Sequence, residues 1–215
     1  HERIYIYSTV FISLAKYSDF ATELGIEAPG LEGYLFPNTY KFYKGIAPDL
    51  VIGEMTRLFH KIMSPENREK AKEMEMSIHD IMTLASIIEG EAQLASERNT
   101  ISGVFHNRLR SGRRLESCAT VQYVLGEPKA VLLDKDLKIP SPYNTYLHRG
   151  LPPGPIGNPG AASLHATLYP VEDTEYLYFV ARGDGTHVFS RTNAEHEVAK
   201  RTVRRQARAA SAGLN

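Results

Sequence analysis

A chain of 215 residues is long enough for one full hydrophobic core or two small ones, and we expect one main domain. Its 25 lysines and arginines balance its 25 aspartates and glutamates, so no overall field favours a polyanion and we expect no nucleic-acid partner. The single cysteine, Cys118, excludes an intrachain disulfide and a cysteine-rich zinc site.

The N-terminal segment predicts a short strand at residues 4–7 and a helix at residues 10–24 that Gly25 closes. We interpret residues 1–30 as the tail of a small preceding unit. The chain opens on His1 without an initiator methionine, so we expect it to be a piece of a longer protein. It has no signal peptide and no run of the ~18 apolar residues that span a bilayer, so we expect the chain as given to be soluble.

The next segment, LEGYLFPNTY at residues 31–40, mixes aromatic and aliphatic residues around one acid. It is compatible with a buried strand, but Pro37 favours an edge or a loop beside a groove. Apolar residues at helical spacing then predict an amphipathic helix from Pro48 to just before Pro65. A polar helix at residues 65–74 follows.

The central prediction is a helix that begins at Ile78. Ser77 and Asp80 have the spacing of a capping box, in which each side chain satisfies a free backbone N–H at the helix start. Successive side chains advance by about 100° around a helix, which places the apolar residues on one continuous arc of its surface that only Glu89 interrupts. Glu91 projects on the other side, near Asp80, where a carboxylate can stay solvated. The arc consists of Leu84, Ile88, Ile81, Ala85, Ile78 and Met82.

Glu89 is the candidate for acid chemistry. A carboxylate held among aliphatic side chains loses hydration, which raises its pKa toward the range where it can donate a proton near neutral pH. The pattern also fits a structural role, in which Glu89 lies at a frayed helix end beside Gly90 and pairs with a nearby arginine.

A second helix is predicted to begin after Ser96, as its cap, and to end at Gly112. Asn107 and Arg108 lie near its far end, where they support either a polar cleft or a solvated helix face. After Gly112 the chain is rich in loops, and the segment at residues 115–123 leads through a short helix to residues 141–146.

The loop at residues 141–160 combines many prolines and glycines with tyrosines and asparagines. This composition favours an ordered loop that forms one wall of a sugar cleft, although a purely structural loop has the same composition. A helix at residues 161–168, a hairpin around Gly183-Asp184-Gly185 and a helix from Thr192 complete the prediction. His187 and His196 lack the spacing of a metal site, so we expect no metal.

Seven segments resemble the YceG-like family of endolytic murein transglycosylases, the MltG type, in the family's order. They are LEGYLFPNTY (31–40), ASIIEGEA (85–92), ERNTISGVFHNRL (97–109), ATVQY (119–123), SPYNTY (141–146), GLPPGPIGNPG (150–160) and YLYFVARGDGTHVF (176–189).

The resemblance implies an α+β fold with central helices and small β-sheets, in which residues 31–215 form the catalytic domain and residues 1–30 a remnant of a LysM-like subdomain. It also implies a bacterial inner-membrane protein with one N-terminal anchor, absent here, and a catalytic domain outside the cytoplasm. The family's catalytic glutamate corresponds to Glu89. The chain departs from the family at Asn38, Gly90 and Cys118, where aspartate, lysine and aspartate are common.

The implied activity is the cleavage of nascent peptidoglycan strands between N-acetylmuramic acid and N-acetylglucosamine. It leaves 1,6-anhydro ends, helps to terminate polymerisation and needs no cofactor, and the expected partners are the glycan strands and penicillin-binding proteins. The alternatives are a hydrolytic muramidase that uses Glu32, Glu91 or Glu97 to activate water, and a non-catalytic peptidoglycan-binding scaffold. The expected substrate-binding residues are Glu32, Tyr34, Glu97, Asn107, Gln122, Tyr143, Asn144 and Tyr146.

Overall fold

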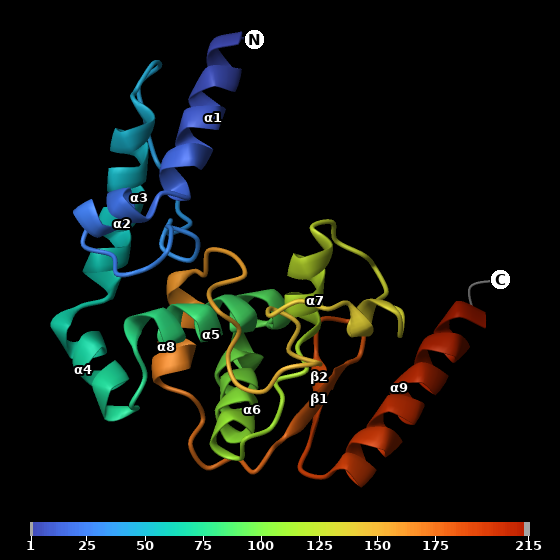
Figure 1. Ribbon diagram of the computed structural model, residues 1–215. Helices are drawn as coiled ribbons and strands as arrows, with labels where there is room; N and C mark the ends of the chain where they lie inside the picture. The colour runs from blue at the N-terminus through green and yellow to red at the C-terminus, as the bar shows by residue number, and fades with distance from the viewer. Residues whose placement is uncertain (1, 213–215) are drawn as a thin grey trace.

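We describe residues 2–212 of a computed structural model, with side chains from residue 8 to residue 209. The fold is α+β, as predicted, and consists mainly of helices with one small antiparallel sheet (Figure 1). Within the described range, no helix is both long and apolar enough to cross a membrane.

The N-terminal part forms an arm that projects from the rest of the molecule (Figure 1). It contains α1 (Glu2–Ala15), α2 (Ser18–Glu23) and α3 (Pro48–Ile62), and α1 packs against α3. The predicted strand at residues 4–7 is wrong, because this segment belongs to α1. A short run of β-branched and aromatic residues does not distinguish a strand from a helix, and here the helix continues until Phe11 and Leu14 contact the core. The predicted helix at residues 10–24 is divided between α1 and α2.

The central helix is α5 (Ile78–Glu91), and it follows α4 (Pro65–Glu73). The capping box is present: the Ser77 hydroxyl accepts the Asp80 N–H and the Asp80 carboxylate accepts the Ser77 N–H, each at 3.0 Å. Every residue from Ile81 to Ile88 is buried. Such a helix is apolar on most sides because it packs against neighbours on most sides, and the prediction of a buried central helix is confirmed.

Two hydrophobic clusters meet on α5. One joins Ile81, Met82 and Ala85 to the base of the arm and to α8 (Ala161–Leu168). The other joins Leu84, Ile87 and Ile88 to α6 (Arg98–Arg110) and to the sheet. Helix α5 therefore holds the two halves of the core together.

The sheet pairs β1 (Tyr178–Ala181) with β2 (His187–Ser190), with Phe179 opposite Phe189. Helix α9 (Asn193–Ala212) packs against both strands (Figure 1). A 3₁₀ turn at Ala95–Glu97 precedes α6, so Ser96 lies inside this turn and is not the cap that we predicted. Helix α7 (Cys118–Leu125) contacts α5, and a 3₁₀ turn at Asp136–Lys138 contacts α7.

Candidate active site

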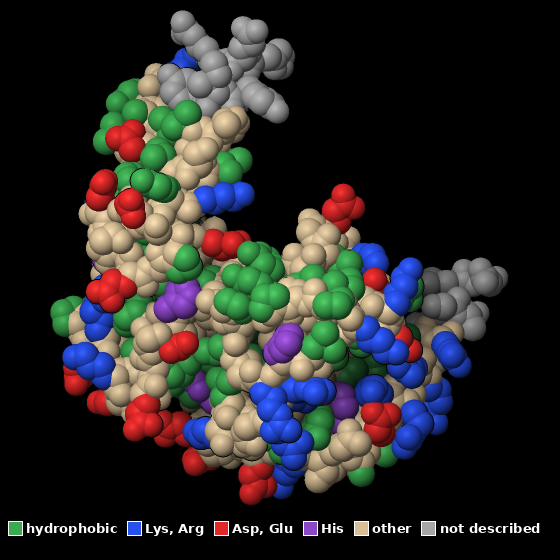
Figure 2. Space-filling model, in the orientation of Figure 1, with side chains coloured by type: hydrophobic (Ala, Val, Ile, Leu, Met, Phe, Trp, Pro, Cys, Tyr) green, Lys and Arg blue, Asp and Glu red, His purple; other side chains and the backbone are tan. Residues whose placement is uncertain are grey.

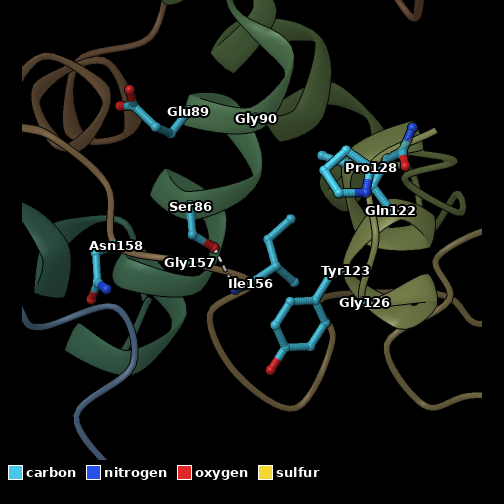
Figure 3. A pocket seen from close by; sticks show the side chains of 11 residues that line it. Ser86, Glu89, Gly90, Gln122, Tyr123, Gly126, Pro128, Ile156, Gly157 and Asn158 are labelled. Carbon is cyan, nitrogen blue, oxygen red and sulfur yellow. Dashed lines mark hydrogen bonds between the residues drawn. The ribbon is translucent and has the colours of Figure 1, made fainter. Parts of the chain in front are cut away.

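A cleft of 580 Å³ lies between the C-terminal end of α5 and α7. Figure 3 shows Glu89 and Ser86 on the α5 side, with Gln122 and Tyr123 on the α7 side. The loop that precedes α8 forms a further wall, and this volume is in the range that accommodates a small ligand. The lining residues are Ser86, Glu89, Gly90, Ala119, Gln122, Tyr123, Gly126, Pro128, Ile156, Gly157 and Asn158.

Glu89 is the one acid among the described residues that line this cleft. Its side chain is exposed, so the expectation that aliphatic neighbours desolvate it is wrong. The reason is that α5 ends two residues later, at Glu91, and the last turn leaves the apolar core. One carboxylate oxygen, Oε2, accepts the backbone N–H of Gly160 at 3.1 Å. Because Gly160 is the N-cap of α8, the positive end of that helix lies beside the carboxylate.

Glu91 is more firmly held than Glu89, contrary to the expectation that it stays solvated. Its Oε1 accepts the Ser117 hydroxyl at 2.6 Å and the Ala119 backbone N–H at 3.0 Å. These donors stand at the start of α7, where the first backbone N–H groups have no partner within the helix. Glu91 therefore ties α7 to α5, and so fixes the width of the cleft.

The loop at residues 150–160 is fixed to α5 and to the segment at residues 31–36. The Ser86 hydroxyl accepts the Ile156 N–H at 2.9 Å, and Asn158 Oδ1 accepts the backbone N–H groups of Gly33 and Leu35 at 2.8 and 3.1 Å. A Cβ atom on Gly33 would lie 2.4 Å from the Pro155 ring, so glycine is required for this approach. Of the loop predicted at residues 141–160, residues 156–158 line the groove beside Glu89, so the prediction of a loop wall is confirmed for that part.

The ring of Tyr123, on the α7 wall, lies close to the ring of Tyr143, but Tyr143 and Glu32 are not themselves among the residues that line the cleft. Tyr123 and Tyr143 have ring centroids 4.9 Å apart, and the Tyr123 hydroxyl donates to Glu32 Oε2 at 2.8 Å. Burial raises the pKa of Tyr123 and the hydrogen bond to Glu32 raises it further, so the phenol remains protonated. The Gln122 amide exchanges two hydrogen bonds with the backbone of Lys129, at 2.7 and 2.8 Å, and so holds the turn that carries Pro128.

Two of the expected substrate-binding residues lie in the interior. Tyr34 is 2% exposed, and its hydroxyl lies 2.9 Å from His79 Nδ1. Asn144 is fully buried, and its amide donates to the carbonyls of Leu137 and Ile139. Both side chains satisfy polar groups inside the fold, because a buried polar group without a partner is costly. Neither lines the cleft.

Three more of the expected residues lie outside the cleft lining. Glu97 accepts the backbone N–H of His187 at 3.1 Å and contacts its ring Nδ1 at 2.8 Å, so it anchors β2. Asn107 donates to the carbonyls of Thr174 and Tyr176 and anchors the segment before β1. The Tyr146 hydroxyl lies 3.3 Å from Cys118 Sγ.

Sequence reasoning did not select three polar residues that line the cleft: Ser86, Tyr123 and Asn158. Ser86 lies in the segment ASIIEGEA, Tyr123 lies in ATVQY next to Gln122, and Asn158 lies in the Pro- and Gly-rich loop. Their role depends on partners 70 or more residues away, such as Ile156 for Ser86 and Glu32 for Tyr123. Helical periodicity contains no signal for such contacts.

Comparison with known proteins gives consistent results. The sequence model described as the YceG-like family matches residues 6–202. The endolytic murein transglycosylase of Bacillus subtilis (strain 168) is 42% identical over 173 residues, which are 79% of this chain and 47% of that protein. The endolytic murein transglycosylase of Streptococcus pneumoniae serotype 2 is 33% identical over 196 residues, 86% of this chain and 35% of that protein.

A solved structure has the same fold. The crystal structure of a yceG-like protein from Listeria monocytogenes superimposes with a TM-score of 0.77 at 37% sequence identity, and the match covers 88% of this chain and 66% of that chain. The present chain thus spans about half of the Bacillus relative's length (47%) and about a third of the Streptococcus relative's (35%).

Proposed function

Because this chain belongs to the YceG-like family, we propose that it cleaves peptidoglycan glycan strands as an endolytic murein transglycosylase, with Glu89 as both general acid and general base. The observation that carries the proposal is that Glu89 is the one acid among the described residues lining a 580 Å³ cleft. The glutamic acid protonates the glycosidic oxygen between N-acetylmuramic acid and N-acetylglucosamine. The carboxylate then removes the proton from the muramoyl C6 hydroxyl as its oxygen closes on C1.

This reaction consumes no water and gives a 1,6-anhydro sugar, so it does not need the second carboxylate of a hydrolytic glycosidase. The contacts of the other acids support this mechanism. Glu91 is occupied by Ser117 and Ala119, and Glu97 is occupied by His187. Both carboxylates hold contacts within the fold and neither lines the cleft, so neither is placed to activate water there.

The N–H of Gly160 supports the acid in both protonation states. It donates to Oε2, which leaves Oε1 as the oxygen that exchanges the proton with the sugar. Tyr123 and Tyr143 offer ring faces for sugar stacking beside Glu32, whose remaining acceptor capacity suits sugar hydroxyls. We place these three residues in the substrate-binding surface.

Glu32 also favours a second candidate function, a muramidase. Glu32 is exposed and accepts a hydrogen bond from Tyr123, a residue of the cleft wall. Among the acids outside the cleft, it is therefore the best candidate for a general base that activates water. Mass spectrometry of glycan digested by the purified chain separates the two functions. Anhydro ends support the transglycosylase, reducing ends support the muramidase, and an unchanged glycan supports a non-catalytic scaffold.

We further propose that residues 31–215 act as the catalytic domain and that residues 1–30 are the tail of a preceding LysM-like unit. The relatives are named for action on murein, a cell-wall polymer, which supports a site of action outside the cytoplasm. An inner-membrane anchor in the whole protein, contact with penicillin-binding proteins and a role in terminating strand synthesis are parts of the same proposal.

A further inference from the structure

A second recess, distinct from the cleft, is lined by arginines. It has a volume of 550 Å³, and its lining includes Arg108, Arg113, Arg114 and Arg149 but only one acid among the described residues, Glu116. We call it the arginine pocket. The chain as a whole has no net charge, so this concentration of positive charge is local. Figure 2 shows Lys and Arg side chains gathered on the half of the molecule that carries α6, β1 and α9.

One of the four arginines belongs to the fold. Arg108 is buried, pairs with Glu116 at 2.8 Å, and donates to the carbonyls of Leu177, Arg114 and Leu115. Its guanidinium also lies over the Tyr178 ring. These contacts occupy its Nε and Nη1 donors and pair its charge with Glu116, so we assign Arg108 to the floor of the pocket.

The other three guanidinium groups have no acidic partner among the residues that the structure describes. Arg113 donates to the Tyr178 hydroxyl at 3.1 Å and Arg149 to the Gly112 carbonyl at 2.9 Å, while the Arg114 side chain has no described hydrogen bond. Because these three side chains are exposed, water screens their mutual repulsion, and an anion bound between them would be attracted by all three. The guanidinium geometry matches oxyanions, to which it donates two parallel hydrogen bonds.

The pocket is close to the cleft along the chain. Glu116 lines the arginine pocket and Ala119 lines the cleft, and three residues of chain span at most about 11 Å. A peptide of four residues reaches about 13–14 Å when extended. At these two lining residues the sites are therefore no further apart than the length of a short extended peptide.

We propose that the arginine pocket binds the carboxylates of the stem peptide attached to the muramic acid of the strand held in the cleft. The proposal rests on the proposed function, which supplies the glycan. It assigns the pocket to substrate selection: strands that carry free stem carboxylates are held at two places, whereas stripped strands are held only in the cleft.

The test compares binding of glycan oligomers with and without their stems, removed by an amidase. The Glu89→Gln variant is used so that the glycan remains intact. We expect it to bind the stem-bearing oligomers at least about tenfold more tightly, as charge-assisted hydrogen bonds suggest. Added Arg114→Gln and Arg149→Gln substitutions should abolish this preference. Arg114→Gln alone removes no described intramolecular bond and should reduce it, while added salt should weaken it.

The matched control removes two charges elsewhere: Arg204→Gln with Arg205→Gln, on the exposed face of α9, should keep the preference. The proposal is overturned if the Glu89→Gln chain with an unaltered pocket binds both oligomers equally, or if the chains with added pocket substitutions keep the preference for stem-bearing oligomers. Binding of inorganic phosphate in the pocket without binding of stem peptides would also overturn it. Product release by the unsubstituted chain tests the chemistry separately. No anhydro product beside a retained stem preference would reject the proposed function alone, and equal product from both oligomers without a preference would reject the pocket alone.

Discussion

The carboxylate of Glu91 accepts the Ser117 hydroxyl at 2.6 Å, across 26 residues of chain. Ser117 is 1% exposed, and the same carboxylate oxygen accepts the Ala119 N–H. Removing an acceptor from donors that are largely out of water costs about 1–3 kcal/mol. The contact therefore links helix stability to the position of the cleft wall.

Glu91→Ala should lower the free energy of unfolding by about 1–3 kcal/mol and reduce turnover, because α7 loses its tie to α5. Glu91→Gln keeps a carbonyl oxygen at the same place and should lose much less of both. Urea denaturation measures the free energy of unfolding of both variants, and anhydro-product release measures their turnover. Equal stability of the alanine and glutamine variants would contradict a capping role for Glu91.

Gly90 determines how closely α5 and α7 approach. A Cβ atom at this position would lie 2.6 Å from the Cβ of Ala119, which is too close for unbonded carbons. Gly90→Ala should displace α7 and reduce turnover roughly tenfold or more, since small misplacements of a site are costly. Adding Ala119→Gly restores the space and should recover activity, at about 1 kcal/mol of helix stability. A fully active single variant would show that the helices separate without consequence.

The sequence predicted features whose partners are near in the chain. The capping box joins Ser77 to Asp80 three residues away, and Pro48, Pro65 and Pro170 mark helix boundaries by their own geometry. Helical spacing also placed Glu89 at the end of the buried helix. The segment at residues 4–7 failed because it is too short for periodicity to distinguish helix from strand.

The details of the site depend on partners that are distant in the chain. The sequence predicted a desolvated Glu89 and a solvated Glu91, whereas in the structure Glu89 is exposed and Glu91 is held by α7. A helical wheel of α5 could not show this, because it contains neither Ser117 nor Gly160. Asn144 and Tyr34 have the residue types of a sugar-binding surface, yet both are buried and bonded within the fold. Which tyrosine or asparagine reaches a cleft is decided by how loops pack, which residue type alone does not specify.

Asn158 connects two loops that meet at the cleft. Its Oδ1 is the acceptor for the N–H groups of Gly33 and Leu35, so Asn158→Ala leaves two largely buried donors unpaired. The free energy of unfolding should fall by about 1–3 kcal/mol. Asn158→Asp keeps an acceptor oxygen and should be less destabilised. Hydrogen exchange of the Gly33 and Leu35 amides gives a local measurement, and unchanged protection in the alanine variant would contradict this role.

His106 should make stability depend on pH. Burial lowers the pKa of its ring below the ordinary value of 6.5, and its Nε2 lies 2.9 Å from the Thr167 carbonyl. As pH falls below 6.5 the unfolded chain binds a proton that the folded chain resists, so stability is full above 6.5 and declines as pH falls. His106→Gln should make the unfolding midpoint less sensitive to pH between 7.5 and 5.5, roughly the histidine range. An unchanged pH dependence would contradict this assignment.

Glu89→Gln tests the proposed chemistry. The glutamine can keep the hydrogen bond from the Gly160 N–H through its carbonyl oxygen, so the fold and glycan binding should persist. It cannot donate and then recover a proton, so turnover should fall by at least ~10²-fold, the lower end for general acid catalysis. Glu91→Gln and Cys118→Ser are controls that should retain substantial activity, because neither side chain lines the cleft. Release of anhydro-muropeptides from purified sacculi is measured for each variant after circular dichroism has verified its fold. A folded Glu89→Gln chain that works at the parental rate would assign the reaction to a different acid, and so would an inactive Glu91→Gln chain whose stability equals that of the parent.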